Sequence, residues 1–405
     1  MSCGSFGQYT ELGRAREGGK VKKIGIVTGT RADFGLLCRT ILLLQSHGDF
    51  DTYTFACGTH LSPEYGLTID ELRDSGVENI VTVEMLLSSA SKVGVAKSTG
   101  LATISFADAF SQHNLDCILL LGDRFETFAA AQAALFLGVP IAHIHGGEVT
   151  EGAFDDALRH SISKMADIHF PAAQVFARRL MQLGEQPSRI FVVGAPGIDN
   201  IMSAPRASQQ QLDAVLTFAD HTAPLVLVTY HPVTRGTSAE NDITALVDVV
   251  KERTDLNFMI TYPNADGEGA EMIAQWQTLS ALPHVSVCPS LGFKRYLSVM
   301  ERASCVLGNS SSGVIEAPSF KVPTINIGTR QQGRPKSCTV IDCQLSEVRS
   351  ALNKALSPEF VMSCQSAENP YGSGNTAKKI VSILADIDLQ QLQPQPFYQS
   401  ENAYE

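Results

Sequence analysis

The sequence lacks three features that would each assign a broad class of protein. No apolar run reaches the ~18 residues that a membrane-spanning helix needs, so we expect no membrane segment. Basic residues are not in excess, because the net charge is −11 and the pI is near 5.4, which argues against general nucleic-acid binding. The first 20 residues lack the apolar core of a signal peptide. These absences predict a cytoplasmic protein without a membrane or nucleic-acid partner.

Patterns for metals and dinucleotides are missing as well. No two of the nine cysteines have C-x-x-C spacing, and most lie in or beside apolar runs, so we expect reduced core thiols. His143 and His145 alternate on a predicted strand and face opposite ways, and His160 and His169 complete no helical metal-binding pair. The G-x-G-x-x-G pattern is absent after the first predicted strand. We therefore predict no metal and no cofactor.

What the sequence does contain is an alternation of apolar strand patterns with helical patterns, twice over. Such alternation indicates parallel sheets covered by helices. We predict strands near residues 24–28, 53–57, 77–83, 118–121, 139–144, 168–170, 189–193, 225–230, 257–262, 285–288, 305–307 and 324–327. We predict helices over 36–45, 86–112, 129–134, 157–165, 172–183, 209–218, 239–251, 269–279, 293–303, 314–320 and 377–385.

The alternation breaks near residues 195–208, which predicts two domains of typical size. The expected fold class is α/β, with two doubly wound Rossmann-like domains and a cleft between them lined by the carboxyl ends of the strands. The predicted ranges are a disordered tail over 1–20, an N-terminal domain over 21–196, a C-terminal domain over 197–376, a helix over 377–389 and a second disordered tail over 390–405.

Residues 118–160 concentrate polar side chains where two predicted strands end. Asp123 follows the first strand, and His145 and Glu148 follow the second. Paired carboxylates with separated pKa values can act as acid and base. Each of them alone could instead be a helix cap or a member of a salt bridge, and Asp155 with its neighbour is a plausible N-cap of the next helix. The concentration of these side chains predicts that any chemistry occurs here.

Three further places fit the recognition of an anion or a sugar nucleotide. Arg31 lies in a turn between a strand and a helix, where it could contact an anion or pair with a neighbouring carboxylate. The loop 308–313, GNSSSG, precedes a helix and could cradle a phosphate or be an ordinary N-cap. Glu316 could favour the helix dipole or hold ribose hydroxyls, and His231 could be a phosphate partner, a proton carrier or a structural histidine.

Together these stretches resemble a known family, the hydrolysing UDP-N-acetylglucosamine 2-epimerases of bacterial sialic-acid and legionaminic-acid synthesis. The chain is also similar to the epimerase half of the bifunctional animal enzyme. The resemblance rests on GTRADFGLL (29–37), GDRFE (122–126), HIHGGEVTEGAFDDALRHSISKM (143–165), VTYHPVT (228–234), GNSSSGVIEAP (308–318), INIGTRQQGR (325–334) and NPYGSGN (369–375).

The resemblance implies a GT-B-like fold in which the C-terminal domain binds most of UDP. It implies that the serine loop, His231 and Arg31 contact the diphosphate and that Glu316 holds the ribose. It assigns substrate binding to Arg31, His231, Asn309, Ser310, Ser311, Ser312, Glu316 and Arg330, and chemistry to Asp123, Glu148, Asp155, His145 and His231.

The sequence departs from many relatives at His145, where they read H-I-E-G-G-E with a glutamate that handles protons at sugar carbon 2. Relatives that read H-I-H-G-G-E include enzymes acting on UDP-N,N′-diacetylbacillosamine. Glu148 could take over the work of the missing glutamate, His145 could do it, or the substrate could differ.

The activity implied is conversion of UDP-N-acetylglucosamine to UDP and N-acetylmannosamine, without NAD or a metal. Elimination of UDP gives a 2-acetamidoglucal, and water then adds back. The alternatives are the same reaction on UDP-N,N′-diacetylbacillosamine, a non-hydrolysing epimerase, a GT-B glycosyltransferase and a nucleotide-sugar sensor. The family implies a homodimer or homotetramer, with the Ser- and Ala-rich helix at 86–112 as a candidate interface.

Overall fold

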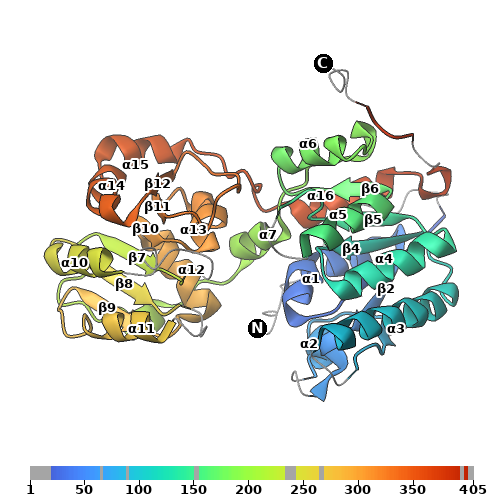
Figure 1. The fold of residues 1–405 in the computed structure, drawn as a ribbon, viewed down its shortest axis with the longest axis horizontal. Helices are drawn as coiled ribbons and strands as arrows, with labels where there is room; N and C mark the ends of the chain where they lie inside the picture. The colour runs from blue at the N-terminus through green and yellow to red at the C-terminus, as the bar shows by residue number, and fades with distance from the viewer. Residues whose placement is uncertain are drawn as a thin grey trace. The chain divides into compact units, whose positions relative to one another are not determined.

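The structure is a computed structural model that describes residues 20–63, 67–87, 91–149, 155–232, 243–263, 269–392 and 396–399. The chain forms two compact units (Figure 1). The first contains the residues up to Asn200 and those from Gly372 onward, and the second contains Ile201–Tyr371. None of the described helices has the length and apolarity needed to cross a membrane.

The first unit is built on a sheet of six parallel strands in the order β3-β2-β1-β4-β5-β6. The central strands are almost wholly buried, which is why they consist of continuous apolar runs. The strands are β1 (Lys22–Thr28), β2 (Phe50–Cys57), β3 (Ile80–Val83), β4 (Cys117–Leu121), β5 (Ile141–Ile144) and β6 (Ile168–Phe170).

Helices cover both faces of this sheet (Figure 1). On one face, α1, α2 and α16 pack in a single core, and on the other face α3, α4 and α5 contribute to a second core. The helices of this unit are α1 (Arg31–Ser46), α2 (Ile69–Asp74), α3 (Lys92–Ser111), α4 (Phe125–Leu137), α5 (Asp155–Met165), α6 (Gln174–Gln182) and α16 (Thr376–Asp386), and α7 (Pro196–Ser203) crosses into the second unit.

Helix α16 follows the second unit in the chain but belongs to the first. The buried carboxylate of Asp199 accepts hydrogen bonds from the backbone N–H groups of Thr376 and Ala377, both at 2.8 Å. At the other end, Lys22 Nζ donates to three carbonyls, those of Leu384, Ala385 and Ile387. A carboxylate at the start and an ammonium at the end both suit the helix dipole, so both ends of α16 are capped by the first unit.

The second unit repeats the architecture with six parallel strands in the order β12-β11-β10-β7-β8-β9. The strands are β7 (Leu225–Thr229), β8 (Asn257–Thr261), β9 (Val285–Cys288), β10 (Cys305–Gly308), β11 (Thr324–Ile327) and β12 (Val340–Cys343). The helices are α8 (Gln209–Asp213), α10 (Thr244–Glu252), α11 (Gly269–Gln277), α12 (Gly292–Arg302), α13 (Ser311–Ile315), α14 (Val348–Ala355) and α15 (Pro358–Gln365).

The two sheets have the same topology when the strands are counted within each unit. Both follow the order 3-2-1-4-5-6, in which the chain direction across the sheet reverses between the first and fourth strands. Those neighbours are β1 and β4 in the first unit, and β7 and β10 in the second. Ligands of doubly wound proteins bind outside the carboxyl ends of the strands at such a switch point. The predicted α/β class and the two Rossmann-like domains are confirmed.

Several predicted elements differ from the structure. The predicted strand 189–193 is not a strand, because only Ile190 bridges to the edge strand β6, at His169. The predicted helix 86–112 begins only at Lys92, where Ser91 accepts a hydrogen bond from Gly94 N. Strand β12 and helices α14 and α15 were not predicted. Strand β12 lies at the edge of its sheet and is partly exposed, so it lacks a continuous apolar run. The pattern of α14 was present in the sequence but overlooked, since its buried residues, Val348, Ala351, Leu352 and Ala355, have helical spacing.

The unit boundaries also differ from the predicted ranges. The second unit is shorter at both ends than 197–376, because Asp199 and Thr376 bind one another within the first unit. The predicted tail 1–20 lies almost entirely outside the described residues. In the predicted tail 390–405, the described residues 396–399 are not disordered, since Tyr398 N donates to the Gly184 carbonyl at 2.8 Å.

Candidate active site

The predicted site residues of the first unit follow the carboxyl ends of β1, β4 and β5, at and beside the switch point. Arg31 is the first residue of α1, not part of a turn, because the Thr30 side chain accepts a hydrogen bond from Asp33 N and starts the helix there. The Arg31 guanidinium is half exposed and pairs with Glu71 at 3.0 Å. The neighbouring carboxylate in the sequence, Asp33, lies 3.9 Å from Arg124.

Asp123 follows β4 and is held by a buried arginine. Arg159 on α5 donates to the Asp123 carboxylate and, at 3.2 Å, to the Glu148 carbonyl. Burial raises the pKa of Asp123 above its ordinary value, although the positive charge of Arg159 opposes the shift. The carboxylates of Asp155 and Glu148 raise the pKa further. Asp123 is thus a carboxyl group that can take up and release a proton nearer to neutral pH than an exposed aspartate.

His145 and Glu148 form a pair in the loop after β5. His145 Nδ1 donates to Glu148 Oε1 at 2.5 Å, and the backbone of His145 is left-handed, with φ of 65°. Burial disfavours the imidazolium, but the carboxylate of Glu148 outweighs it, so the pKa of His145 is raised. A histidine in this state can carry a proton that an adjacent carboxylate stabilises.

Asp155 lies in the first turn of α5, so the reading of this residue as the cap that precedes the helix is wrong. Its charge acts on Asp123 and on Arg124, which places it near the same group of side chains.

Arg159, four residues beyond Asp155 along the same helical face, was not among the predicted site residues. The spacing of an acid and an arginine by four residues was the signal that could have identified it.

In the second unit, Asn309 joins the two loops of the switch point. Its fully buried side chain accepts from His231 N at 2.7 Å and donates to the His231 carbonyl at 2.8 Å. Gly308, just before it, has φ of 146°, and a Cβ there would lie 1.9 Å from the Thr229 carbonyl oxygen. Only glycine therefore allows β10 to lead into this loop. Both bonds use the backbone of His231, so they hold its loop beside Asn309.

The serine loop differs in detail from the prediction. Helix α13 begins at Ser311, three residues before the predicted start, and Ser310 is its N-cap. The predicted helix 314–320 ends at Ile315 and continues as a 3-10 turn, Ala317–Phe320, because Pro318 lacks the N–H that an α-helix would use.

Tyr296 of α12 was not predicted at all, yet its hydroxyl lies 2.6 Å from Ser312 Oγ, which in turn donates to Ser310 Oγ at 3.0 Å. The pattern of α12 suggested only an amphipathic helix, so no local signal marked this residue. Three hydroxyl groups therefore gather at the start of α13.

Three other side chains, those of Glu316, Arg330 and Gln331, complete the second group, which is the set of candidate residues in the second unit. Glu316 follows α13 directly, and burial raises its pKa to about 7. Arg330 Nη1 and Gln331 Nε2 both donate to the Asn309 carbonyl, at 3.1 and 2.9 Å. The second group is thus made mainly of hydroxyls, amides and one arginine around the end of β10. Gln331, like Tyr296, was missing from the predicted residues.

Comparison with known proteins identifies the family. The profile of the UDP-N-acetylglucosamine 2-epimerase family matches residues 43–385. The chain is 35% identical to the GDP/UDP-N,N′-diacetylbacillosamine 2-epimerase (hydrolyzing) of Campylobacter jejuni, over 84% of this chain and 88% of that protein. It is 34% identical to the UDP-N,N′-diacetylbacillosamine 2-epimerase (hydrolyzing) of Legionella pneumophila, over 91% and 97%.

The chain belongs to the UDP-N-acetylglucosamine 2-epimerase family. A crystal structure of the Neisseria meningitidis UDP-GlcNAc 2-epimerase bound to UDP-GlcNAc has the same fold, with a TM-score of 0.71 at 21% identity, over 89% of this chain and 99% of that one. The predicted resemblance is confirmed, and this epimerase is an enzyme of the UDP-sugar 2-epimerase class.

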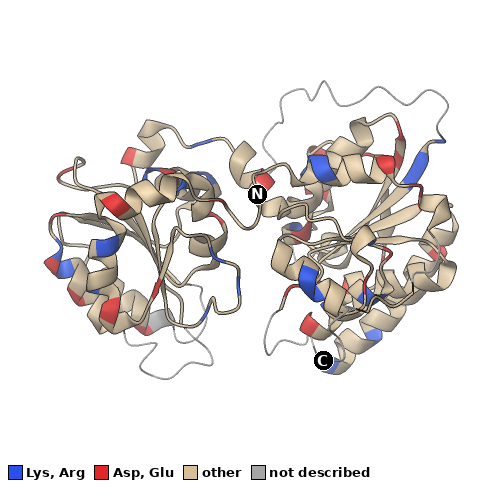
Figure 2. Cartoon of the chain, turned by 90° about the horizontal axis from the view of Figure 1, so that it is seen from above, with Lys and Arg blue, Asp and Glu red and all other residues tan. Residues whose placement is uncertain are grey.

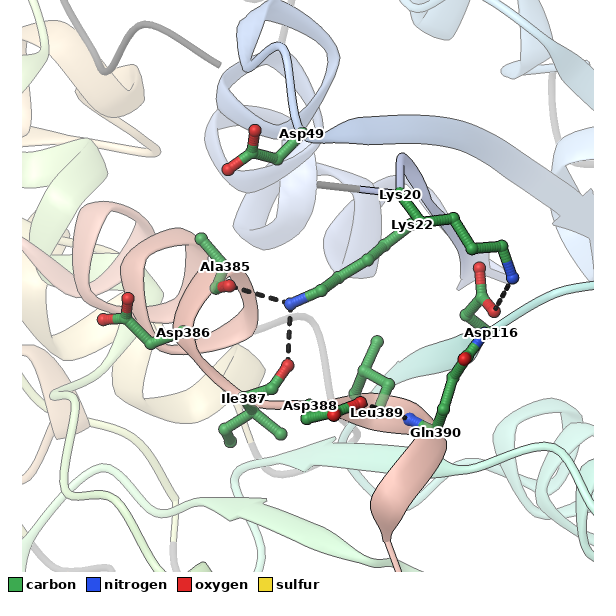
Figure 3. Close-up of a pocket in the computed structure, with 10 residues that line it drawn as sticks. All are labelled: Lys20, Lys22, Asp49, Asp116, Ala385, Asp386, Ile387, Asp388, Leu389 and Gln390. Atoms are coloured by element: carbon green, nitrogen blue, oxygen red, sulfur yellow. Dashed lines mark hydrogen bonds and ion pairs between the residues drawn. The ribbon is translucent and has the colours of Figure 1, made fainter. Parts of the chain in front are cut away.

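A cavity of about 260 Å³ in the first unit of the epimerase lies away from this chemistry (Figure 3). Lys22, Asp49 and Asp116, which line it, lie at the amino ends of β1, β2 and β4, the sheet edge opposite Asp123. Its other wall is the end of α16, whose carbonyls Lys22 caps. Lys22, one of the polar groups of this cavity, thus serves the docking of α16.

The distribution of charged side chains and of possible metal ligands bears on two of the predictions. Lys and Arg are interspersed with Asp and Glu over both units of the epimerase (Figure 2). In the parts of the chain that the structure describes, no group of three His, Cys, Asp or Glu side chains could hold a metal ion. Of the described cysteines all are free and most are buried, as expected from their apolar surroundings.

Proposed function

We propose that this epimerase removes UDP from a UDP-2-acetamido sugar by hydrolysis and inverts carbon 2 of the sugar. The observation that supports it most is the cluster of side chains at the switch point. Arg159 donates to the Asp123 carboxylate and to the Glu148 carbonyl, and the Glu148 side chain is bonded to His145. The carboxyl of Asp123 and the imidazole of His145, whose pKa values are both raised, belong to this cluster. The names of the two relatives at about 35% identity, both hydrolysing, support the same branch of the family.

The proposed reaction has two steps. A carboxylate of the cluster takes the proton from carbon 2 while the bond between carbon 1 and the UDP oxygen breaks, which leaves a 2-acetamidoglucal. Water then adds its oxygen to carbon 1, and a proton is delivered to carbon 2 from the opposite face. We assign the two proton transfers to Asp123 and to the His145–Glu148 pair, with Asp155 beside them. The net change is hydrolysis with inversion at carbon 2.

We assign UDP binding to the second unit and to Arg31. Ser310, Ser311 and Ser312 present hydroxyls and helix-start N–H groups suited to a diphosphate. His231 and Arg330 come from two different loops that are both tied to Asn309, and the guanidinium of Arg330 adds positive charge that stabilises the leaving group. His231 is assigned to the same diphosphate. Glu316 accepts the ribose hydroxyls.

Two sugars are candidates for the substrate. UDP-N-acetylglucosamine is the substrate implied by the sequence motifs, and the Neisseria structure was solved with it. UDP-N,N′-diacetylbacillosamine is favoured by the names of the two hydrolysing relatives and by His145 in place of glutamate. The products would be UDP with N-acetylmannosamine or with the corresponding diacetamido sugar of inverted carbon 2.

The test is product identification by NMR after incubation with each UDP-sugar in heavy water. The proposal expects free UDP, a sugar of inverted carbon 2, and one deuterium at that carbon. Formation of an epimeric UDP-sugar without free UDP would instead show a non-hydrolysing epimerase. Turnover that requires an acceptor would show a glycosyltransferase. Binding of UDP without turnover of either sugar would show a sensor, and each of these results would overturn the proposal.

We also propose that the epimerase forms a homodimer or homotetramer in the cytoplasm. Helices α3 and α4 lie side by side, and Thr103 Oγ1 bonds Gln132 Oε1 between them at 3.1 Å (Figure 1). The pair exposes large apolar side chains that a second copy could cover, namely Val93, Leu101, Ile104, Leu135, Phe136 and Leu137. Light scattering of the wild type and of Phe136→Lys tests this, with dissociation of the variant as the expected result.

A further inference from the structure

His143 is a buried histidine that the proposed chemistry leaves without a role. It lies on β5 with no exposed surface, so it cannot touch a substrate. The sequence suggested it only as a weak metal-ligand candidate, yet both of its ring nitrogens are taken. Nε2 lies 2.8 Å from the Gly122 carbonyl oxygen, and Nδ1 lies 3.0 Å from Ser163 Oγ.

These two bonds determine the state of the ring. A carbonyl oxygen can only accept, so Nε2 carries the hydrogen. Burial lowers the pKa of His143 to about 3, so the ring is neutral and Nδ1 has a free lone pair. That lone pair accepts the hydroxyl hydrogen of Ser163. The ring therefore has one tautomer and one orientation.

The partners of His143 belong to the three segments that carry the cluster. Gly122 directly precedes Asp123 and has φ of 80°, so it is a left-handed residue that its neighbours must hold in place. Ser163 lies on α5, four residues beyond Arg159, on the helical face that holds the Asp123 carboxylate. His143 itself precedes His145 by two residues. One imidazole thus ties the β4 loop, β5 and α5 together.

The backbone of Gly146 packs closely against the bond between His143 and Ser163. A Cβ added at Gly146 would lie 2.8 Å from Ser163 Oγ and 3.1 Å from His143 Nδ1. The Gly122 carbonyl belongs to the peptide that joins Gly122 to Asp123. The orientation of this peptide therefore affects the direction of the Asp123 Cα–Cβ bond.

We propose that His143 is a positioning residue that fixes the Gly122–Asp123 peptide through its Nε2–H and so aims the Asp123 carboxyl group at the sugar. The inference rests on the proposed catalytic role of Asp123. A displacement of about 1 Å can lower a rate by about 10²-fold, so the loss of this one bond should be measurable in kcat.

Two amide substitutions test the two hydrogen bonds of the ring one at a time. In His143→Gln the side-chain nitrogen can occupy the place of Nε2 and donate to Gly122. In His143→Asn the amide reaches only the place of Nδ1, near Ser163, and the Gly122 carbonyl is left without a donor. We expect His143→Asn to lower kcat by about 10²-fold with little change in KM, and His143→Gln to keep kcat within about tenfold of wild type.

The control measurements distinguish positioning from stability and from the proposed function. Thermal unfolding is recorded for both variants, and Ser163→Ala removes only the Nδ1 partner while it leaves the Gly122 bond in place. In wild type, long-range ¹H–¹⁵N NMR should show His143 as the neutral Nε2–H tautomer, a readout that keeps the inference testable if either variant fails to fold. Ser163→Ala should keep this tautomer and a kcat within about tenfold of wild type. Equal losses in the Gln and Asn variants, no loss in Asn, an Nδ1–H tautomer, or a loss of about 10²-fold in Ser163→Ala would each overturn the inference. Asp123→Asn, measured alongside, separates the positioning role of His143 from the proposed function. If Asp123→Asn keeps full activity, the proposed function fails. If Asp123→Asn is inactive while His143→Asn is active, only the positioning role is refuted.

Discussion

The two groups of site residues occupy equivalent places in two sheets of the same topology, yet they are chemically unlike. After β4 and β5 the first unit gathers charged side chains, with Asp123, Glu148 and His145 bonded to one another or to Arg159. After β7 and β10 the second unit gathers mainly neutral groups, with the amide of Asn309 and the hydroxyls of Ser310 and Ser312. The same strand order thus presents two kinds of chemistry.

The difference follows from what each group can do with a proton. Coupled carboxyl and imidazole groups have shifted pKa values and can exchange protons at neutral pH. Hydroxyls and N–H groups keep their protons but can hold an anion without bringing a fixed charge. On the proposed function, changes in the first group should affect kcat, and changes in the second should affect KM.

The largest effect is expected for Asp123→Asn, which cannot accept a proton. We expect kcat for UDP release to fall by about 10³-fold, with KM less affected. The matched control is Asp156→Asn, a carboxylate 3.5 Å from the same Arg159 that the proposal leaves outside the chemistry. Coupled-enzyme detection of UDP measures both variants. Equal losses in the two would mean that charge around Arg159, and not the proton of Asp123, matters.

A somewhat smaller loss is expected for His145→Gln. Glutamine keeps a donor for Glu148 but cannot carry a proton, so kcat should fall by about 10²-fold. Glu148 raises the pKa of His145, so in wild type kcat should fall at high pH as His145 loses its proton. This fall in kcat should be absent from the variant. Steady-state rates between pH 5 and 9 provide the measurement. A variant with wild-type rates would place proton transfer on Asp123 and Glu148 alone.

In the second group, Ser310→Ala should raise KM by about tenfold and change kcat little, because one hydroxyl donor to a charged group is lost. The variant also loses the N-cap of α13 and about 1 kcal/mol of stability. Ser208→Ala is matched to it, since Ser208 is the N-cap of α8 in the same unit. Both should show similar losses in urea unfolding. If Ser208→Ala raised KM as well, the effect would come from helix stability and not from phosphate contact.

The smallest effect concerns pH and Glu316. Burial raises the pKa of Glu316 to about 7. On the proposed function, ribose hydroxyls donate to its ionised form. UDP affinity should therefore rise toward pH 7, by up to about tenfold per pH unit, and level off above it. Calorimetry from pH 5.5 to 8.5 measures this, and Glu316→Gln should remove the slope. A slope that survives in the variant would belong to another group, such as His231.

The raised pKa of Glu316 also makes the stability of the protein depend on pH. Stability falls with rising pH, whereas UDP affinity rises. Between the ordinary value of 4.5 and about 7, the folded protein holds the Glu316 proton more tightly than the unfolded chain. The free energy of unfolding therefore decreases as pH rises through this range. Urea unfolding of wild type and Glu316→Gln at pH 5 and pH 8 should show this difference, and parallel curves would contradict it.

Much of this organisation could be predicted from local sequence. Continuous apolar runs mark strands buried on both faces, and their regular separation by helical patterns predicts parallel sheets. The chain must place polar residues at strand ends, so Asp123, Asn309 and Ser310 were evident as candidates. Strand β12 was missed because it is a partly exposed edge strand, so it lacks the continuous apolar run of the buried strands.

The fold class and the chemical types of the candidate side chains could be predicted, because both follow from local sequence patterns. Which of these side chains meet depends on the three-dimensional arrangement of the chain. Arg159 holds Asp123 across 36 positions of the chain, Tyr296 reaches Ser312, and His143 joins Gly122 to Ser163. Such pairings depend on strand order and helix packing, which bring together segments that no local pattern relates. The capping of α16 by the first unit, after an entire second unit, has the same origin.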